Sequence, residues 1–192
     1  MRIISGKFKG RSIKIPKNLP IRPTTNLAKE SIFNIISNKI DFNSLKVLDL
    51  FTGSGMIGLE FISRGSDVTF VENNIKCVKH VSNTLNILSI NSKIIKKDVF
   101  KYLINCDDKY DLIFADPPYS LKIENYEKLI KLATENILKN SNGLFILEHY
   151  KKNDFSQHHN FFEMRSYGDC SFTFFKQYLC IVSFKIEFGL KI

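Results

Sequence analysis

The sequence has no long apolar segment and few cysteines. No run approaches the roughly 18 to 20 apolar residues that span a bilayer. The N-terminal stretch "MRIISGKFKGR" is charged and lacks the continuous apolar core of a signal peptide. The four cysteines are far apart and form no C-x-x-C pair; they are Cys77, Cys106, Cys170 and Cys180. These absences predict a cytoplasmic protein with reduced thiols, no membrane segment and no metal site.

Acidic side chains are missing from the first 29 residues, and Glu30 is the first one. The same segment carries eight basic residues, namely Arg2, Lys7, Lys9, Arg11, Lys14, Lys17, Arg22 and Lys29. The rest of the chain is nearly neutral, with 20 basic and 19 acidic residues. A segment of this kind attracts polyanions by counterion release. We therefore expect a nucleic acid partner, against the alternative of a solvated, lysine-rich end.

The hydrophobic pattern predicts one α/β domain, which suits a length of 192 residues. After Leu45, short apolar runs typical of strands alternate with segments whose apolar residues have helical spacing. This alternation predicts an open parallel sheet. The expected strands are 46–51, 67–72, 92–98, 111–116 and 143–150, and the expected helices are 26–39, 53–65, 74–88 and 126–138. Two further strands, 161–168 and 170–177, are joined by Gly168-Asp169. This turn predicts an antiparallel hairpin at the edge of the parallel sheet.

The two ends of the chain differ from this alternation. Residues 2–15 have β-branched runs around a Gly-Lys-Phe-Lys-Gly centre, which predicts a basic β-hairpin. We expect residues 1–23, the hairpin and its connector, to belong to the same domain as residues 24–176. Residues 177–192 form an extension, in which 182–189 alternates like a half-buried strand.

A glycine-rich turn follows the first strand of this series. Gly53, Gly55 and Gly58 fit the pattern G-x-G-x-x-G, and Glu72 ends the next strand. Glycines let the backbone turn tightly beside a ligand at the carboxyl edge of the sheet, and a carboxylate can accept both ribose hydroxyls. The pattern alone fits a dinucleotide dehydrogenase as well as other nucleoside cofactors.

Asp49 narrows the choice of cofactor. It is an acid within the first strand, four residues before Gly53. Its charge would repel a pyrophosphate but would not repel S-adenosylmethionine, which carries an ammonium group and a sulfonium and no phosphate. Asp98 ends the third strand, where it could meet an adenine amino group, although Asp also often caps a helix.

The fourth strand ends in "DPPY", residues 116–119. An exocyclic amine on a base is a poor nucleophile because its lone pair is delocalised into the ring. The Asp116 carboxylate and the Pro117 carbonyl could accept both of its N–H hydrogens and aim the lone pair, and Asp116 could stabilise the developing positive charge. Proline fixes φ and so preorganises the turn. Tyr119 offers a face on which a flipped base can stack.

With these motifs in hand, the sequence resembles the RsmD family, the bacterial 16S rRNA guanine-N2 methyltransferases. The resemblance runs from Met1 to about Lys176 through "MRIISGKFKGR", "RPTT", "KESIFNII", "VLDLFTGSGMIGLE", "VTFVE", "DPPY", "EH" and "YGD". It implies a Rossmann-like, seven-stranded methyltransferase fold, S-adenosylmethionine and 16S rRNA in small-subunit particles. Thr52 departs from the expected alanine in the glycine loop, and the residues from Gln177 onward extend past the usual end.

The resemblance also implies roles for residues at matching positions. The expected cofactor-binding residues are Asp49, Phe51, Gly53, Gly55, Glu72, Asn73, Asp98 and Val99. The expected catalytic residues are Asp116, Pro117, Pro118 and Tyr119, and the expected RNA-binding residues are Arg2, Lys7, Lys9, Arg11, Arg22, Thr24 and Thr25. We expect a monomer.

Three other functions fit parts of this pattern. An adenine-N6 methyltransferase would use the same turn, but the sequence leaves little room for a target-recognition domain. A nicotinamide-dependent oxidoreductase is disfavoured by Asp49 and "DPPY". A non-catalytic RNA-binding or assembly factor would explain the basic N-terminus but not the cofactor motif.

Overall fold

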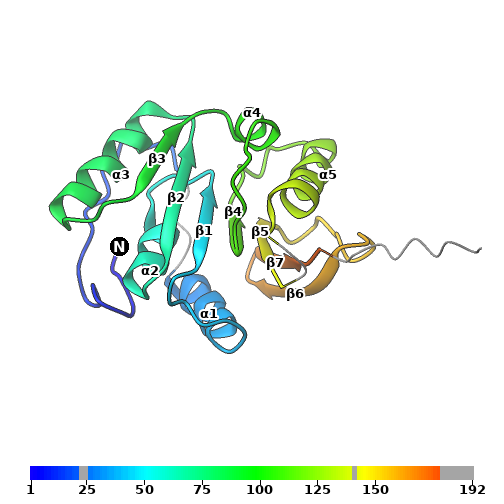
Figure 1. The fold of residues 1–192 in the computed structure, drawn as a ribbon, viewed down its shortest axis with the longest axis horizontal. Helices are drawn as coiled ribbons and strands as arrows, with labels where there is room; N and C mark the ends of the chain where they lie inside the picture. The colour runs from blue at the N-terminus through cyan, green and yellow to red at the C-terminus, as the bar shows by residue number, and fades with distance from the viewer. Residues whose placement is uncertain (22–25, 140–141, 178–192) are drawn as a thin grey trace, which may run out of the picture.

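A seven-stranded sheet forms the centre of the molecule (Figure 1). The computed structural model describes residues 1–21, 26–139 and 142–177. The strand order is β3-β2-β1-β4-β5-β7-β6. The strands are β1 (Lys46–Leu50), β2 (Asp67–Glu72), β3 (Lys93–Lys96), β4 (Leu112–Ala115), β5 (Leu144–Tyr150), β6 (Phe161–Tyr167) and β7 (Cys170–Phe175). The first five strands pair in parallel, and β7 runs antiparallel to both β5 and β6.

Helices cover both faces of the sheet. One hydrophobic cluster joins it to α1 (Asn26–Ser37), α2 (Met56–Ser63) and α3 (Ile75–Ile87). A second cluster joins the other face to α4 (Val99–Ile104), α5 (Ile123–Lys131) and the π-helix η1 (Leu132–Ile137). Strands buried on both faces explain the nearly continuous apolar runs in the sequence. None of the helices in the described part of the chain is long and apolar enough to cross a membrane.

The expected α/β fold is confirmed, including the antiparallel β6–β7 hairpin. The strand at residues 67–72 has the predicted bounds, and the other strands differ from prediction by a few residues. The helix expected over 126–138 begins at Ile123 and continues as η1. Helix α4 was not predicted. The strand expected at 182–189 lies outside the described residues.

The N-terminal β-hairpin is not confirmed as a pair of strands. Only one antiparallel bridge forms, between Arg2 and Ser12. Backbone hydrogen bonds from Ile3 N to Arg11 O (3.0 Å) and from Ile13 N to Met1 O (2.7 Å) extend this pairing slightly. Ladder pairing is limited because Ile4 N, Lys7 N and Phe8 N bond to helix α2 instead.

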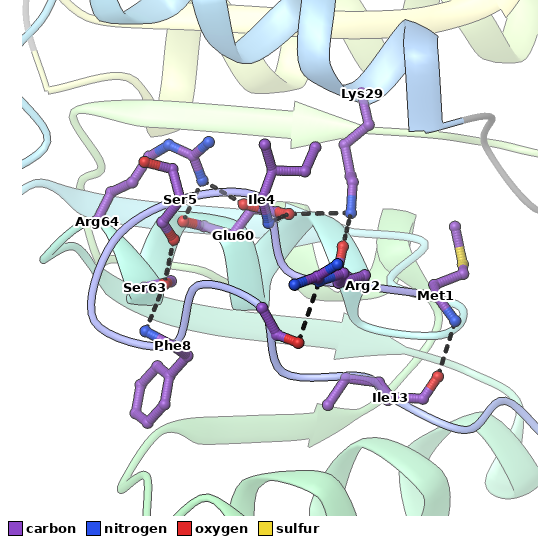
Figure 2. A network of polar contacts seen from close by, with 11 residues as sticks. Met1, Arg2, Ile4, Ser5, Phe8, Ile13, Lys29, Glu60, Ser63 and Arg64 are labelled. Carbon is purple, nitrogen blue, oxygen red and sulfur yellow. Dashed lines mark hydrogen bonds and ion pairs between the residues drawn. The ribbon is translucent and has the colours of Figure 1, made fainter.

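Helix α2 holds the N-terminal segment through its polar side (Figure 2). Ile4 N donates to Glu60 Oε1 at 2.8 Å, and Phe8 N donates to Ser63 Oγ at 3.0 Å. Lys7 N donates to Ser63 O at 2.6 Å. Gly6 has a φ of +80°, and a Cβ there would lie 1.8 Å from Ser63 O. The close approach of the two backbones therefore requires glycine at this position.

A buried ion pair joins helix α1 to the same contact. The Lys29 and Glu60 side chains are fully buried, with 2.9 Å between Lys29 Nζ and Glu60 Oε1. Lys29 Nζ also donates to Arg2 O at 2.9 Å. Arg64 pairs with Glu60 Oε2, and its guanidinium lies 4.3 Å from the centroid of the Phe33 ring. Every partner in this group is hydrogen-bonded, as a buried charge requires.

Replacing Lys29 by methionine should destabilise the protein by about 3–5 kcal/mol, because it removes one partner of a buried pair. Loss of the donor also leaves the Arg2 carbonyl unpaired. Chemical denaturation of the two proteins measures the difference. Lys39→Met is the matched control, since Lys39 pairs with Glu163 at 2.9 Å while both side chains remain partly exposed. We expect less than about 1 kcal/mol there; equal losses in the two variants would contradict the assigned role of Lys29.

Candidate active site

The carboxyl ends of β1, β2 and β4 lie side by side, and each brings an acid to the same edge of the sheet. Leu50 of β1 is in register with Val71 of β2 and with Ala115 of β4. Glu72 and Asp116 follow these two partners directly. Asp49 lies one residue earlier, on β1. The register of β1, β2 and β4 therefore brings three acids together at one edge of the sheet.

Asp49 is buried, with 2% of its surface exposed. Its Oδ2 accepts a hydrogen bond from Gly58 N at 3.1 Å. Burial raises the pKa of Asp49 well above its ordinary value, and the charges of Asp116 and Glu72 raise it further. Gly58 makes this arrangement feasible, since a Cβ there would lie 2.1 Å from Phe70 Cε1 and 2.8 Å from Asp49 Oδ2.

The Glu72 carboxylate holds the glycine loop in place. Its Oε2 accepts from Gly53 N at 2.8 Å, and its Oε1 accepts from Asn74 N at 2.7 Å. Each oxygen can accept a further hydrogen bond, so both ends remain capable of receiving a ribose hydroxyl. The carboxylate is thus oriented in advance by the backbone of two neighbouring loops.

Left-handed backbone conformations shape the loop after β1. Gly53 has a φ of +56° and Gly55 has a φ of +78°. Phe51 has a φ of +55°, which costs about 1–3 kcal/mol for a residue other than glycine. The Thr52 hydroxyl donates to Asp49 O at 2.8 Å and contacts Val71 O at 3.3 Å. The threonine in place of the expected alanine therefore ties the loop to β1 and β2.

The remaining predicted cofactor residues lie near the ends of β2 and β3. Asn73 is exposed directly after β2. Asp98 caps α4, and its carboxylate accepts from Lys101 N at 3.0 Å. The helix-capping interpretation of Asp98 is confirmed, and its contact with an adenine stays a prediction. Val99 is the first residue of α4 and is buried in the core, with 2% of its surface exposed.

The "DPPY" turn presents side chains of differing exposure. Pro117 is buried, Pro118 is exposed, and Asp116 and Tyr119 are partly exposed. The turn is closed by a hydrogen bond from Leu121 N to Pro118 O at 2.8 Å. The Tyr119 ring packs against Tyr150, with 5.7 Å between centroids. Asp116 therefore stays accessible while the turn beneath it is fixed.

Sequence reasoning missed three residues beside this turn. Tyr150 and Glu148 come from β5, and Tyr126 comes from α5. The "EH" motif contained a signal for Glu148, since it is an acid near the end of a strand. His149, the other member of the motif, is fully buried and bonds to Thr173 Oγ1 at 2.8 Å. Burial lowers the pKa of His149, which favours a neutral packing role.

The predicted RNA-binding side chains fall into two groups. Arg2, Lys7, Lys9 and Arg11 are exposed on the N-terminal segment. Arg22, Thr24 and Thr25 lie outside the described residues. Ile21, just before them, approaches the glycine loop, because a Cβ on Gly53 would lie 3.3 Å from Ile21 Cγ2.

One of the basic residues behaves differently from expectation. Lys29 was counted with the polyanion-attracting charges, yet its side chain is fully buried against Glu60. This part of the interpretation was wrong, because charge counting cannot see a partner 31 residues away in the sequence.

Comparison with known proteins agrees with this geometry. The family described as "Conserved hypothetical protein 95" matches residues 1–176. A putative rRNA methyltransferase of Bacillus subtilis, YlbH, is 36% identical over 78% of this chain and 82% of its own length. The ribosomal RNA small subunit methyltransferase D of Buchnera aphidicola from Acyrthosiphon pisum is 38% identical over 80% of this chain and 74% of its own.

A solved structure has a similar fold. It is a putative methyltransferase from Escherichia coli, which superposes with a TM-score of 0.79 at 23% identity. The match covers 92% of this chain and 97% of that one. At this level of identity the comparison establishes the fold.

With no ligand bound, the Asp49→Asn variant should be more stable than the parent protein at neutral pH. The folded-state pKa of Asp49 is raised, so the folded state binds the proton more tightly than the unfolded state. Ionisation of Asp49 therefore lowers the free energy of unfolding as the pH rises from about 4 through that raised pKa. Asparagine keeps an oxygen for Gly58 N and does not ionise. Thermal unfolding of both proteins from pH 4 to 8 measures the gain, which should widen with pH.

The exposed Asp154→Asn is the control for this series, since a hydrogen bond from Ser156 N lowers the pKa of Asp154. No stabilisation is expected there. If Asp49→Asn were as stable as the parent protein at every pH, the buried-charge account of Asp49 would fail.

Proposed function

The chain belongs to the RsmD family, and we propose that it transfers a methyl group from S-adenosylmethionine to the N2 amine of a guanine in 16S rRNA. The observation that carries this proposal is the convergence of Asp49, Glu72 and Asp116 at one sheet edge beside the glycine loop. The relatives named rRNA methyltransferases support rRNA as the substrate. No metal is needed for this chemistry, and the described residues contain no group of side chains suited to hold one.

The residues at this edge fit S-adenosylmethionine. Burial raises the pKa of Asp49, and the charges of Asp116 and Glu72 raise it further. The three carboxylates therefore lie close enough to repel one another. A sulfonium and an ammonium group relieve that repulsion, whereas a pyrophosphate would increase it. Glu72, held by Gly53 N, is the candidate acceptor for the ribose hydroxyls. Phe51, Asn73, Asp98 and Val99 are the remaining candidates around the cofactor.

When bound, S-adenosylmethionine supplies an electrophilic methyl group. Asp116 and the Pro117 carbonyl accept the two N–H hydrogens of the guanine amine and direct its lone pair at that methyl. The carboxylate also stabilises the positive charge that develops on the amine nitrogen until that nitrogen releases one N–H proton to water. Pro117 and Pro118 keep the acceptors in a fixed geometry. Most of the acceleration comes from this alignment and from electrostatics.

Aromatic packing supports the target base. Tyr119 is the candidate stacking surface for a guanine taken out of its RNA context. Its ring rests on Tyr150 at 5.7 Å between centroids, tilted by 33°. Two rings this close leave no space for a base between them. Tyr150 therefore acts as a support that fixes the orientation of Tyr119, and the base stacks on the opposite face.

The N-terminal segment is the candidate contact for the RNA backbone. Arg2, Lys7, Lys9 and Arg11 are exposed and lie in a stretch without acids. Arg22, Thr24 and Thr25 follow Ile21, which approaches the glycine loop. We infer that these residues bring the RNA toward the cofactor, and that the protein acts as a cytoplasmic monomer on small-subunit particles.

Asp116→Ala should lower methyl transfer to small-subunit particles by about a hundredfold or more, because it removes the acceptor of the amine. Binding of S-adenosylhomocysteine, followed by calorimetry, should be largely retained. Transfer of labelled methyl groups measures activity, and Asp107→Ala, at an exposed position, is the control. Full methylation by Asp116→Ala would refute the catalytic assignment. Label that appeared only in duplex DNA would refute the rRNA substrate.

Replacing Lys7, Lys9 and Arg11 together by glutamine should weaken RNA binding and flatten its dependence on salt. Each lost phosphate contact reduces the slope of log K against log salt by about 0.7 to 0.9. Binding titrations with 16S rRNA at several salt concentrations measure both quantities. Lys128, Lys131 and Lys139 are exposed on the α5 side and serve as the matched triple control. An unchanged slope in the N-terminal variant would rule out the segment as the RNA contact.

A further inference from the structure

Glu148 lies beside the proposed catalytic turn, on the neighbouring strand. Ala115 of β4 is in register with Leu147 of β5, so the next positions along the two parallel strands are Asp116 and Glu148. Glu148 is nearly inaccessible, with 5% of its surface exposed. The β4–β5 register therefore places the Glu148 carboxylate on the strand next to Asp116, at the carboxyl edge of the sheet.

A second observation points to a ligand at the same place. Tyr126 is fully buried, and its hydroxyl has no hydrogen-bond partner among the described residues. Burial raises the pKa of Tyr126 to about 12, with contributions from the charges of Asp116 and then Glu148. The hydroxyl therefore lies in the field of both carboxylates. A buried hydroxyl that lacks a partner is costly, which is consistent with a site that a polar ligand completes.

The edge of guanine matches two neighbouring carboxylates. Guanine presents its N2 amine and the N1–H next to it, which are adjacent hydrogen-bond donors. Adenine presents an amine beside an N1 that carries a lone pair. A carboxylate next to Asp116 therefore attracts the N1–H of guanine and repels the N1 of adenine.

We propose that the Glu148 carboxylate selects guanine by accepting a hydrogen bond from its N1–H while Asp116 holds the N2 amine. This inference rests on the proposed function and adds the residue that fixes the identity of the base. It also gives a physical reason why this turn would reject an adenine. Discrimination of this type combines an attractive contact with the right base and a repulsive one with the wrong base.

The analogue 2-aminopurine separates these contacts, because it keeps the amine at C2 and has a lone pair at N1. Once the methylated guanine has been mapped, 2-aminopurine replaces it in a 16S rRNA substrate. We expect the wild-type protein to prefer guanine in kcat/KM by about a hundredfold. Glu148→Gln should reduce this preference at least tenfold, because the glutamine amide can donate to the N1 lone pair.

The comparison of the two preferences isolates Glu148. The analogue also lacks the oxygen at C6. That loss affects kcat/KM in both proteins, so it cancels when the guanine preference of the variant is divided by that of the wild type. Glu163→Gln, on β6 of the same sheet, is the matched control and should keep the wild-type preference. Retained S-adenosylhomocysteine binding would show that Glu148→Gln folds.

Two results would overturn the proposal. One is an equal preference for guanine in Glu148→Gln and wild type. The other needs no variant and so holds even if Glu148→Gln fails to fold: wild-type protein that methylates 2-aminopurine as well as guanine does not recognise N1–H. Failure of the proposed function is distinguishable, since the wild-type protein would then transfer no methyl group to rRNA guanine at all.

Discussion

A single buried carboxylate, that of Glu60, organises the N-terminal half of the molecule. This α2 side chain accepts hydrogen bonds or ion pairs from Ile4 N of the N-terminal segment, from Lys29 of α1 and from Arg64, directly after α2. Figure 2 shows these three parts meeting at one point. Because such a carboxylate is tolerable only when it is fully partnered, the three parts are fixed together. Helix α2 begins directly after the glycine loop. The basic N-terminal segment and the glycine loop are therefore both attached to this one helix.

The acids at the carboxyl edge of the sheet, unlike Glu60, lower the stability of the protein. Asp49 is held by one backbone N–H from Gly58, and its neighbours Asp116 and Glu72 oppose its ionisation. Phe51 keeps a left-handed backbone conformation in the loop beside it. Both features cost stability, and strained or repulsive groups of this kind concentrate where a ligand binds. Helix α2 takes part in both regions, through Glu60 in one and through Gly58 N in the other.

Local patterns in the sequence predicted the elements well. The 67–72 strand, the parallel series and the β6–β7 hairpin follow from apolar runs and turn residues, and the acids were placed because parallel strands end at one edge. Contacts between distant residues could not be predicted in this way. The burial of Lys29 depends on Glu60, and the short N-terminal pairing depends on hydrogen bonds to Ser63. Tyr126, Glu148 and Tyr150 became candidates only through the β4–β5 register and the packing of α5.

The central claim is that this chain methylates N2 of a guanine in 16S rRNA. Mass-spectrometric mapping of methylated nucleosides in 16S rRNA, from cells with and without the protein, tests it most directly. The account predicts that one N2-methylguanosine disappears without the protein and returns when the wild-type gene is restored. An unchanged set of N2-methylguanosines in cells that lack the protein would contradict it.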